Sequence, residues 1–325
     1  MEFDDSILFS VFGLPVTAYA LCLALAVGAG LFLFFRLGKK EKIRDDALWS
    51  TALWAIPLSL LGARVFYCLC RIRMYLEIGP ISILKLWEGG YALWGAVGGA
   101  CLAGFIGAKR HGESIHRLLD VMAAPGALVI AACRFGECLI GQGYGPEIEN
   151  EALWFFPLCV FRENYEEWNL AVFMLEGLYA LILLGVLLSK RRPEGDRAKL
   201  FLILYSSGQI LLESLRRDSY LRWLFVRVSQ LTAALVIALV MGFALAKWIK
   251  SKENRRFTPG AWVGCWIAVL GLVGVCVAME FSVDGKGKLL TDIPVPLAYL
   301  VMGLCCAALC FVSCRAVFHS VTDKQ

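Results

Sequence analysis

The chain alternates long apolar runs with short polar connections. An α-helix needs about 20 mostly apolar residues to cross a bilayer. Lipid cannot satisfy the hydrogen-bonding groups of an open strand edge, so helices are expected in these runs. The sixth run is short and carries several polar side chains, which makes it the weakest by hydropathy. Nine runs fit this length approximately: 17–37, 47–69, 91–108, 118–139, 170–189, 200–215, 226–246, 261–279 and 295–317.

Composition strengthens this interpretation and excludes other classes. Apolar residues make up 59% of the 325 residues and charged residues 18%, whereas soluble domains have about 45–50% and about 25%. The 13 cysteines lie almost entirely in or beside apolar runs, where a thiol usually serves as a small apolar group. The sequence therefore predicts an all-α polytopic membrane protein with no disulfide framework, no metal site and no cofactor.

The distribution of Lys and Arg predicts the orientation. The odd-numbered loops carry 18 of these residues and the even-numbered loops carry nine. Cytoplasmic loops are enriched in Lys and Arg, so we expect a multi-pass protein of the bacterial cytoplasmic membrane with its N-terminus outside and its C-terminus in the cytoplasm. The basic residues form short clusters at span ends and no continuous stripe, so nucleic-acid binding is not expected.

Polar side chains inside the spans are expensive and need a reason. They lie late in even spans or early in odd spans, which is the outer half of the membrane in the expected orientation. Tyr205, Gln209, Glu213 and Arg216 also follow helical spacing on one face. Interhelical hydrogen bonds and residues reaching for the membrane surface are the simplest alternative. The group that shares this depth comprises Tyr19, Arg64, Trp94, Arg134, Glu137, Gln209, Glu213 and Gln230.

These residues and the glycines near them resemble the prolipoprotein diacylglyceryl transferase family over about residues 10–245. The resemblance rests on Tyr19, on Gly62-Ala63-Arg64 with Tyr67, on Trp87-Glu88-Gly89-Gly90 with Gly95 and Gly98-Gly99, on Asp120 and Pro125, on Arg134-Phe135-Gly136 with Gly141 and Tyr144-Gly145, on Tyr205, Glu213 and Arg216, and on Gln230.

Several positions depart from that family's pattern. The family has His at Trp94, Arg at Gln209, and Asn and Glu at Glu137 and Gln142. Its fifth-helix Tyr-Glu pair falls on Ala171-Val172. Runs 261–279 and 295–317 have no counterpart in the family's usual seven-helix body. We therefore expect a transferase-like body over residues 1–250 and two added helices with a short cytoplasmic tail over 251–325, packed peripherally and not reaching the polar residues.

The resemblance implies a lipid transfer. The diacylglyceryl group of phosphatidylglycerol would pass to the lipobox cysteine thiol of a secreted precursor protein at the outer half of the bilayer. Glu213, Arg134 and Tyr205 would be catalytic, with Glu213 favoured as the base over Glu137, which can pair with Arg134 at i, i+3. A weakened paralogue that binds phospholipid or precursor is the alternative. The residues expected to bind substrate are Tyr19, Arg64, Glu137, Gly141, Gly145, Arg216 and Gln230.

Overall fold

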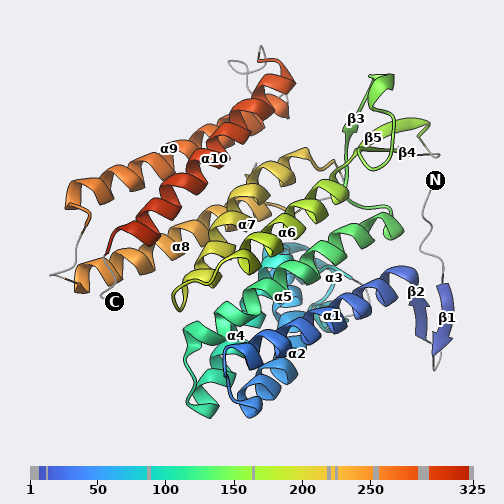
Figure 1. Ribbon diagram of the computed structural model, residues 1–325. Coiled ribbons are helices and arrows are strands. Elements are labelled where there is room, and N and C mark those ends of the chain that lie inside the picture. The colour runs from blue at the N-terminus through green and yellow to red at the C-terminus, as the bar shows by residue number, and fades with distance from the viewer. Residues whose placement is uncertain are drawn as a thin grey trace.

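The computed structural model describes residues 7–11, 14–85, 89–162, 165–217, 221–223, 226–251, 256–284 and 293–321. Trp87 and Glu88, half of the expected third-helix motif, lie outside these residues. Helices dominate and run alongside one another (Figure 1). They are α1 (Ala18–Lys40), α2 (Asp45–Cys70), α3 (Ile72–Ile78), α4 (Leu93–His111), α5 (Ile115–Gly136), α6 (Val172–Ser189), α7 (Asp196–Leu215), α8 (Val228–Lys250), α9 (Pro259–Val283) and α10 (Val295–His319), with 3₁₀ turns η1 (Pro80–Leu84), η3 (Glu137–Ile140) and η4 (Glu151–Leu153).

Short antiparallel strands flank the helices. β1 (Ile7–Val11) pairs with β2 (Leu14–Thr17), and β6 (Arg222–Trp223) pairs with β7 (Val226–Arg227). A three-stranded sheet places β5 (Glu167–Ala171) between β3 (Tyr144–Glu147) and β4 (Cys159–Arg162). In Figure 1 the β1–β2 pair and the β3–β5–β4 sheet lie at the same end of the helices, and the end of α10 lies at the other.

The all-α polytopic membrane fold expected from the sequence is confirmed. Each of the nine predicted runs coincides with one helix to within a few residues. Among the described residues, seven helices are long and apolar enough to cross a membrane: α1, α2, α5 with η3, α6, α8, α9 and α10. The other two long helices fall short, because Lys109, Arg110 and several glycines lower the hydropathy of α4 and the polar face lowers that of α7. Their neighbours in the bundle cover these polar or small faces.

Glycines set the close packing of α2 against α4. A Cβ at Gly95 would collide with the backbone of Gly62, and a Cβ at Gly99 would collide with the carbonyl of Leu58. A Cβ at Gly98 would meet no atom within 4 Å. Two glycines of α4, Gly95 and Gly99, therefore let the backbones approach, as small residues do in membrane helix pairs, whereas Gly98 takes no part in this contact.

Helix α5 lies at the centre of the body and packs against α1, α4, α6 and α7. Helix α7 in turn packs against α5, α6, α8 and α10. The last turn of α5 and the last turns of α7 are thereby brought to the same end of the bundle. The β3–β5–β4 sheet lies at this same end of the bundle (Figure 1). The polar ends of α5 and α7 therefore meet beneath that sheet.

The C-terminal helices α9 and α10 pair with each other, and α10 packs on α7 and α8. Trp262 of α9 is 2% exposed and packs with Trp248 of α8. Beyond the end of α8, the backbone N–H of Arg256 donates to the carbonyl of Ser320, at a distance of 3.0 Å. Helices α9 and α10 therefore cover one flank of the body, and we call them the C-terminal hairpin (residues 259–319).

Candidate active site

Arg134 stands in the last turn of α5 and its side chain is 13% exposed. Its Nη1 donates to the carboxylate of Glu137, one turn further on. Its Nε lies 3.3 Å from Oε2 of Glu176 on α6. The ion pair between Arg134 and Glu137 that i, i+3 spacing allowed is therefore present in the structure, and a second carboxylate reaches the same guanidinium from another helix.

Arg216 brings a second guanidinium to the same two carboxylates. It follows directly after α7 and its side chain is 9% exposed. Its Nη1 lies 3.0 Å from Oε2 of Glu137 and 2.9 Å from Oε2 of Glu176. Glu137 and Glu176 are thus each shared between Arg134 and Arg216. Charge-assisted contacts are stronger than hydrogen bonds between neutral groups, and burial in a low-dielectric site strengthens them further.

Gln209 bridges two carboxylates on the same face of the group. Its Nε2 lies 3.1 Å from Oε1 of Glu176 and 3.1 Å from Oε2 of Glu213. The side chains of this stripe are buried because α7 is covered by α5, α6, α8 and α10. We refer to the whole group as the Arg134 cluster, and it comprises Arg134, Glu137, Glu176, Gln209, Glu213 and Arg216.

Glu176 is the member that sequence reasoning missed. It is 2% exposed and is the only charged residue between Val172 and Ser189. A lone ionisable residue within a span is itself a signal of a functional site, and Glu176 lies early in an odd span, at the depth predicted for the others. The family's fifth-helix Tyr-Glu pair aligns with Ala171-Val172 and not with this carboxylate.

Aromatic rings border the cluster, among them those of Tyr205, Trp94 and Tyr19. Tyr205 is 2% exposed and faces the Arg134 guanidinium. Trp94 packs edge-on against Tyr205 with ring centroids 5.8 Å apart. Tyr19 is half-buried beside Arg134 and Glu137, and its ring packs over Gly136. An indole therefore fills the space where the resemblance places a histidine.

Glycines occupy the connection from η3 into β3, which passes beside the cluster. Gly141, with φ +65°, ends η3 in the left-handed region and is exposed. Gly143 has φ +79°, and a Cβ there would lie 2.9 Å from Oε2 of Glu137. Gly145 is packed against Val172, which would lie 2.7 Å from an added Cβ. Glycine is favoured at 143 because φ is positive and an added Cβ would lie 2.7 Å from Cβ of Phe173, and the turn passes close to the Glu137 carboxylate.

The family model for prolipoprotein diacylglyceryl transferase matches residues 6–248. The chain belongs to this family. A phosphatidylglycerol–prolipoprotein diacylglyceryl transferase of Shouchella clausii is 31% identical over 75% of this chain and 90% of its own length. A protein with the same name from Streptococcus suis is 31% identical over 78% of this chain and 95% of its own length. The C-terminal hairpin lies beyond the residues that the family model matches.

Arg64 does not join the Arg134 cluster in its described contacts. It lies in α2 and is 3% exposed. Its Nη2 donates to the carbonyls of Ser82 at 2.9 Å and Lys85 at 3.0 Å, and its Nη1 donates to the carbonyl of Gly89. The guanidinium therefore holds together the connection between α3 and α4 in this member of the transferase family.

Gln230 belongs to a second buried group. Its Nε2 donates to the carbonyl of Ile210 at 3.0 Å and lies 3.2 Å from Oε2 of Glu280 on α9. Glu280 is 6% exposed and lies one residue past the predicted end of its span. The expectation that the C-terminal hairpin does not reach the polar residues is therefore wrong. We call Ser214, Arg227, Gln230 and Glu280 the Glu280 cluster.

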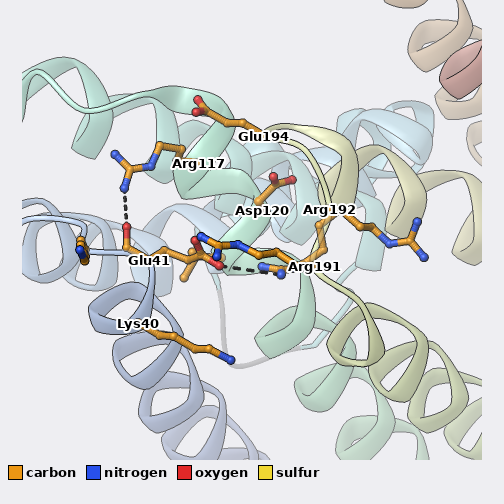
Figure 2. Close-up of a pocket in the computed structure, with 10 residues that line it drawn as sticks. Lys40, Glu41, Arg117, Asp120, Arg191, Arg192 and Glu194 are labelled. Atoms are coloured by element: carbon orange, nitrogen blue, oxygen red, sulfur yellow. Dashed lines mark hydrogen bonds and ion pairs between the residues drawn. The ribbon is translucent and has the colours of Figure 1, made fainter. Parts of the chain in front are cut away.

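A cavity of about 390 Å³ lies at the other end of α5. Arg117 lines it and Arg134 stands 17 residues later, a helical rise of about 25 Å. Figure 2 shows charged side chains from the end of α1, the start of α5 and the connection before α7 around it. At its base the Asp120 carboxylate accepts from the backbone N–H of Gly195 and Ala198, at 2.6 and 2.7 Å. The residues that line the cavity are Lys40, Glu41, Lys42, Arg117, Asp120, Val121, Arg191, Arg192, Glu194 and Arg197.

The described residues contain no group of three or more His, Cys, Asp or Glu side chains placed to hold a metal ion. Instead, the chemistry that the Arg134 cluster supports is binding of an anion and transfer of a proton. It provides two guanidiniums, each with several N–H donors, and three carboxylates in a buried site. Guanidiniums suit phosphate groups, and a carboxylate in such a site is a candidate proton acceptor.

Proposed function

We propose that this protein transfers the diacylglyceryl group of phosphatidylglycerol to the lipobox cysteine thiol of a secreted precursor protein, at the outer half of the bacterial cytoplasmic membrane. A thioether bond forms between the cysteine sulfur and the glycerol carbon of the lipid. The bond from that carbon to the phosphate oxygen breaks, and glycerol phosphate leaves. Membership of the family and the names of the curated relatives support this reaction. The observation that carries it is the buried pair of guanidiniums, Arg134 and Arg216, on one carboxylate pair.

Arg134 and Arg216 are the proposed phosphate ligands. Both reach the same space from different helices, because both contact Glu137 and Glu176. A phosphate that displaces one of these carboxylates would find two guanidinium donors already aimed at one point. Such a clamp stabilises the charge that grows on the leaving phosphate, which is the largest contribution a preorganised site makes to catalysis.

Glu213 is the proposed base. The thiolate, not the thiol, is the nucleophile, so the proton of the lipobox cysteine needs an acceptor. Glu137 contacts both guanidiniums, whereas the contact described for the Glu213 carboxylate is with the neutral amide of Gln209. The carboxylate that is least committed to an ion pair is the better acceptor.

The remaining expected residues take supporting roles in the proposal. Tyr205 and Tyr19 border the cluster and would donate hydrogen bonds to phosphate or glycerol oxygens. Gly141 and Gly145 shape the turn over Glu137. We assign Arg64 to the connection before α4 and Gln230 to the Glu280 cluster, because their described contacts lie there.

We place the end of the bundle that holds the cavity in the cytoplasm. Six Lys and Arg side chains and three acidic side chains line that cavity, and cytoplasmic ends of membrane proteins are enriched in basic residues. The Arg134 cluster and the β3–β5–β4 sheet lie at the opposite end, where a secreted precursor would arrive (Figure 1). This orientation puts the N-terminus outside and the C-terminus in the cytoplasm.

A weakened paralogue that binds phospholipid or precursor is the second candidate. It is favoured by the charge of the Arg134 cluster, in which three carboxylates face two guanidiniums, and by Gln209 and Trp94 in place of the family's Arg and His. A phosphodiester would add one more negative charge to this group. A site of this composition holds a phosphate less firmly than one with a third cation.

The deciding experiment is thioether formation by the purified full-length protein. Phosphatidylglycerol in nanodiscs and a synthetic lipobox peptide are supplied, and the peptide mass is followed. We expect a gain of one diacylglyceryl group that is lost in Arg134→Ala. A parent protein that makes no thioether, yet binds phosphatidylglycerol in an Arg134-dependent manner, contradicts the transferase and supports the paralogue. Arg315→Ala, on α10 and outside both clusters, is the matched control for loss of a cation.

A further inference from the structure

A buried ion pair joins the C-terminal hairpin to the body. Glu280 lies in the last turn of α9, and its Oε1 is 2.8 Å from Nε of Arg227, the residue that precedes α8. The side chains are 8% and 1% exposed, respectively. Taking two charges out of water is costly, and a buried pair seldom stabilises more than apolar side chains of the same size. The pair therefore calls for a role other than packing.

The same carboxylate ties three helices together. Its Oε2 accepts from Ser214 Oγ on α7 and lies 3.2 Å from Nε2 of Gln230 on α8. From α10, the hydroxyl of Tyr299 donates to the carbonyl of Ser214 at 3.3 Å. Both helices of the hairpin thus contact the last turn of α7, although neither belongs to the part of the chain that the family model matches.

Arg227 carries this connection to the candidate active site. Its Nη1 donates to the backbone carbonyls of Glu213 and Arg216, the latter at 3.0 Å. The last four carbonyls of a helix have no partner within the helix, and a cation there also complements the helix dipole. Glu213 and Arg216 are the proposed base and a proposed phosphate ligand, so Arg227 fixes the backbone from which both side chains project.

We propose that Glu280 is a positioning residue for the transfer reaction, which rests on the proposed function. It orients Arg227, and Arg227 holds the end of α7 so that Glu213 and Arg216 stay aligned with the phosphate and the thiol. The C-terminal hairpin is then a part of the catalytic unit, contributed from outside the matched body. Apolar contacts alone, such as Trp262 against Trp248, would keep the hairpin attached without this carboxylate.

The test compares the parent with Glu280→Gln and Ser313→Ala, all full length in phosphatidylglycerol-containing nanodiscs. Ser313 is buried on α10 outside both clusters, so its loss is a matched control in the same hairpin. Transfer kinetics are measured at saturating lipid, and hydrogen–deuterium exchange is followed in the peptide covering 212–217. For Glu280→Gln we expect kcat to fall about 10–100-fold, as misplacement of about 1 Å can cost, with the KM for the lipobox peptide unchanged. Amide exchange over 212–217 should be about tenfold faster or more, as local opening becomes easier.

A double variant keeps the test decisive if Glu280→Gln folds poorly. Arg227→Met with Glu280→Met removes both charges, so no buried charge is left uncompensated and the fold is expected to persist. It should show the same loss of kcat and the same faster exchange. Parent-like kcat in either variant, or unchanged exchange over 212–217, overturns the proposal. A parent that transfers no lipid refutes the proposed function instead, while the exchange data still decide whether Glu280 holds the end of α7.

Discussion

Nη1 of Arg216, at the end of α7, lies 2.9 Å from Oε2 of Glu176 on α6. Because Glu176 also contacts Arg134 on α5, one carboxylate joins three helices. Glu176 is thus, together with Glu137, a carboxylate that fixes the geometry of both guanidiniums. The pairing also explains why an acid is tolerated near the start of an apolar helix.

Glu176→Ala should therefore destabilise the protein strongly. Breaking a buried ion pair from one side costs about 3–5 kcal/mol, and here both Arg134 and Arg216 lose a carboxylate and are left sharing Glu137. Glu176→Gln preserves the shape and leaves two guanidiniums with two carboxylates, so we expect a smaller loss of about 1–3 kcal/mol. Unfolding by SDS in mixed micelles measures both. A Glu176→Ala variant as stable as the parent would show that the cluster is not held as an ionic network.

The two remaining carboxylates should behave differently. Glu213→Gln removes the proposed base, so the chemical step in single-turnover transfer should slow by roughly 10²–10⁴-fold. Glu137→Gln removes a carboxylate that competes with phosphate for Arg134 and Arg216. We expect tighter phosphatidylglycerol binding and a much smaller effect on the chemical step. A parent-like rate in Glu213→Gln rejects that residue as the base.

Arg134 should matter through geometry as well as charge. Arg134→Ala removes the proposed phosphate donor, and charge-assisted hydrogen bonds contribute about 1.5–3 kcal/mol each, so phosphatidylglycerol affinity should fall by at least about tenfold. Arg134→Lys keeps the charge but loses the planar fork, and we expect only partial recovery. Native mass spectrometry of lipid-bound protein provides the measurement. Equal affinities for Arg134→Ala and the parent would place the phosphate elsewhere.

Two neighbouring glycines of α4 give a paired test of the fold. A Cβ at Gly99 would collide with the backbone carbonyl of Leu58 on α2, whereas a Cβ at Gly98 has open space. Gly99→Ala should push the helices apart and cost about 1–3 kcal/mol, the usual range for overpacking. Gly98→Ala should leave stability unchanged or slightly raised. Thermal unfolding in detergent distinguishes them, and equal melting temperatures would contradict the close approach of α2 and α4.

Much of the site was predictable because a bilayer orders residues along one axis. Hydropathy located the helices, and the alternation of span direction put Arg134, Glu137, Gln209 and Glu213 at one depth. The i, i+3 pairing of Arg134 with Glu137 was also readable from the chain, since it depends only on helical spacing. Depth, however, does not say which way a side chain points around its helix. Arg64 shares the depth of the cluster and yet binds the carbonyls of Ser82 and Lys85.

What the sequence by itself determined is thus the class of fold, the positions of the helices and the level of the polar groups. These follow from local composition and the fixed thickness of lipid. Only the tertiary structure decided the partners: Glu176 between two guanidiniums, and Glu280 on Arg227. The physical reason is that a buried charge is tolerated where another helix supplies its counter-charge. Whether a counter-charge is supplied depends on how each helix is rotated and on which helices are its neighbours. Both are set by contacts between residues far apart in the chain.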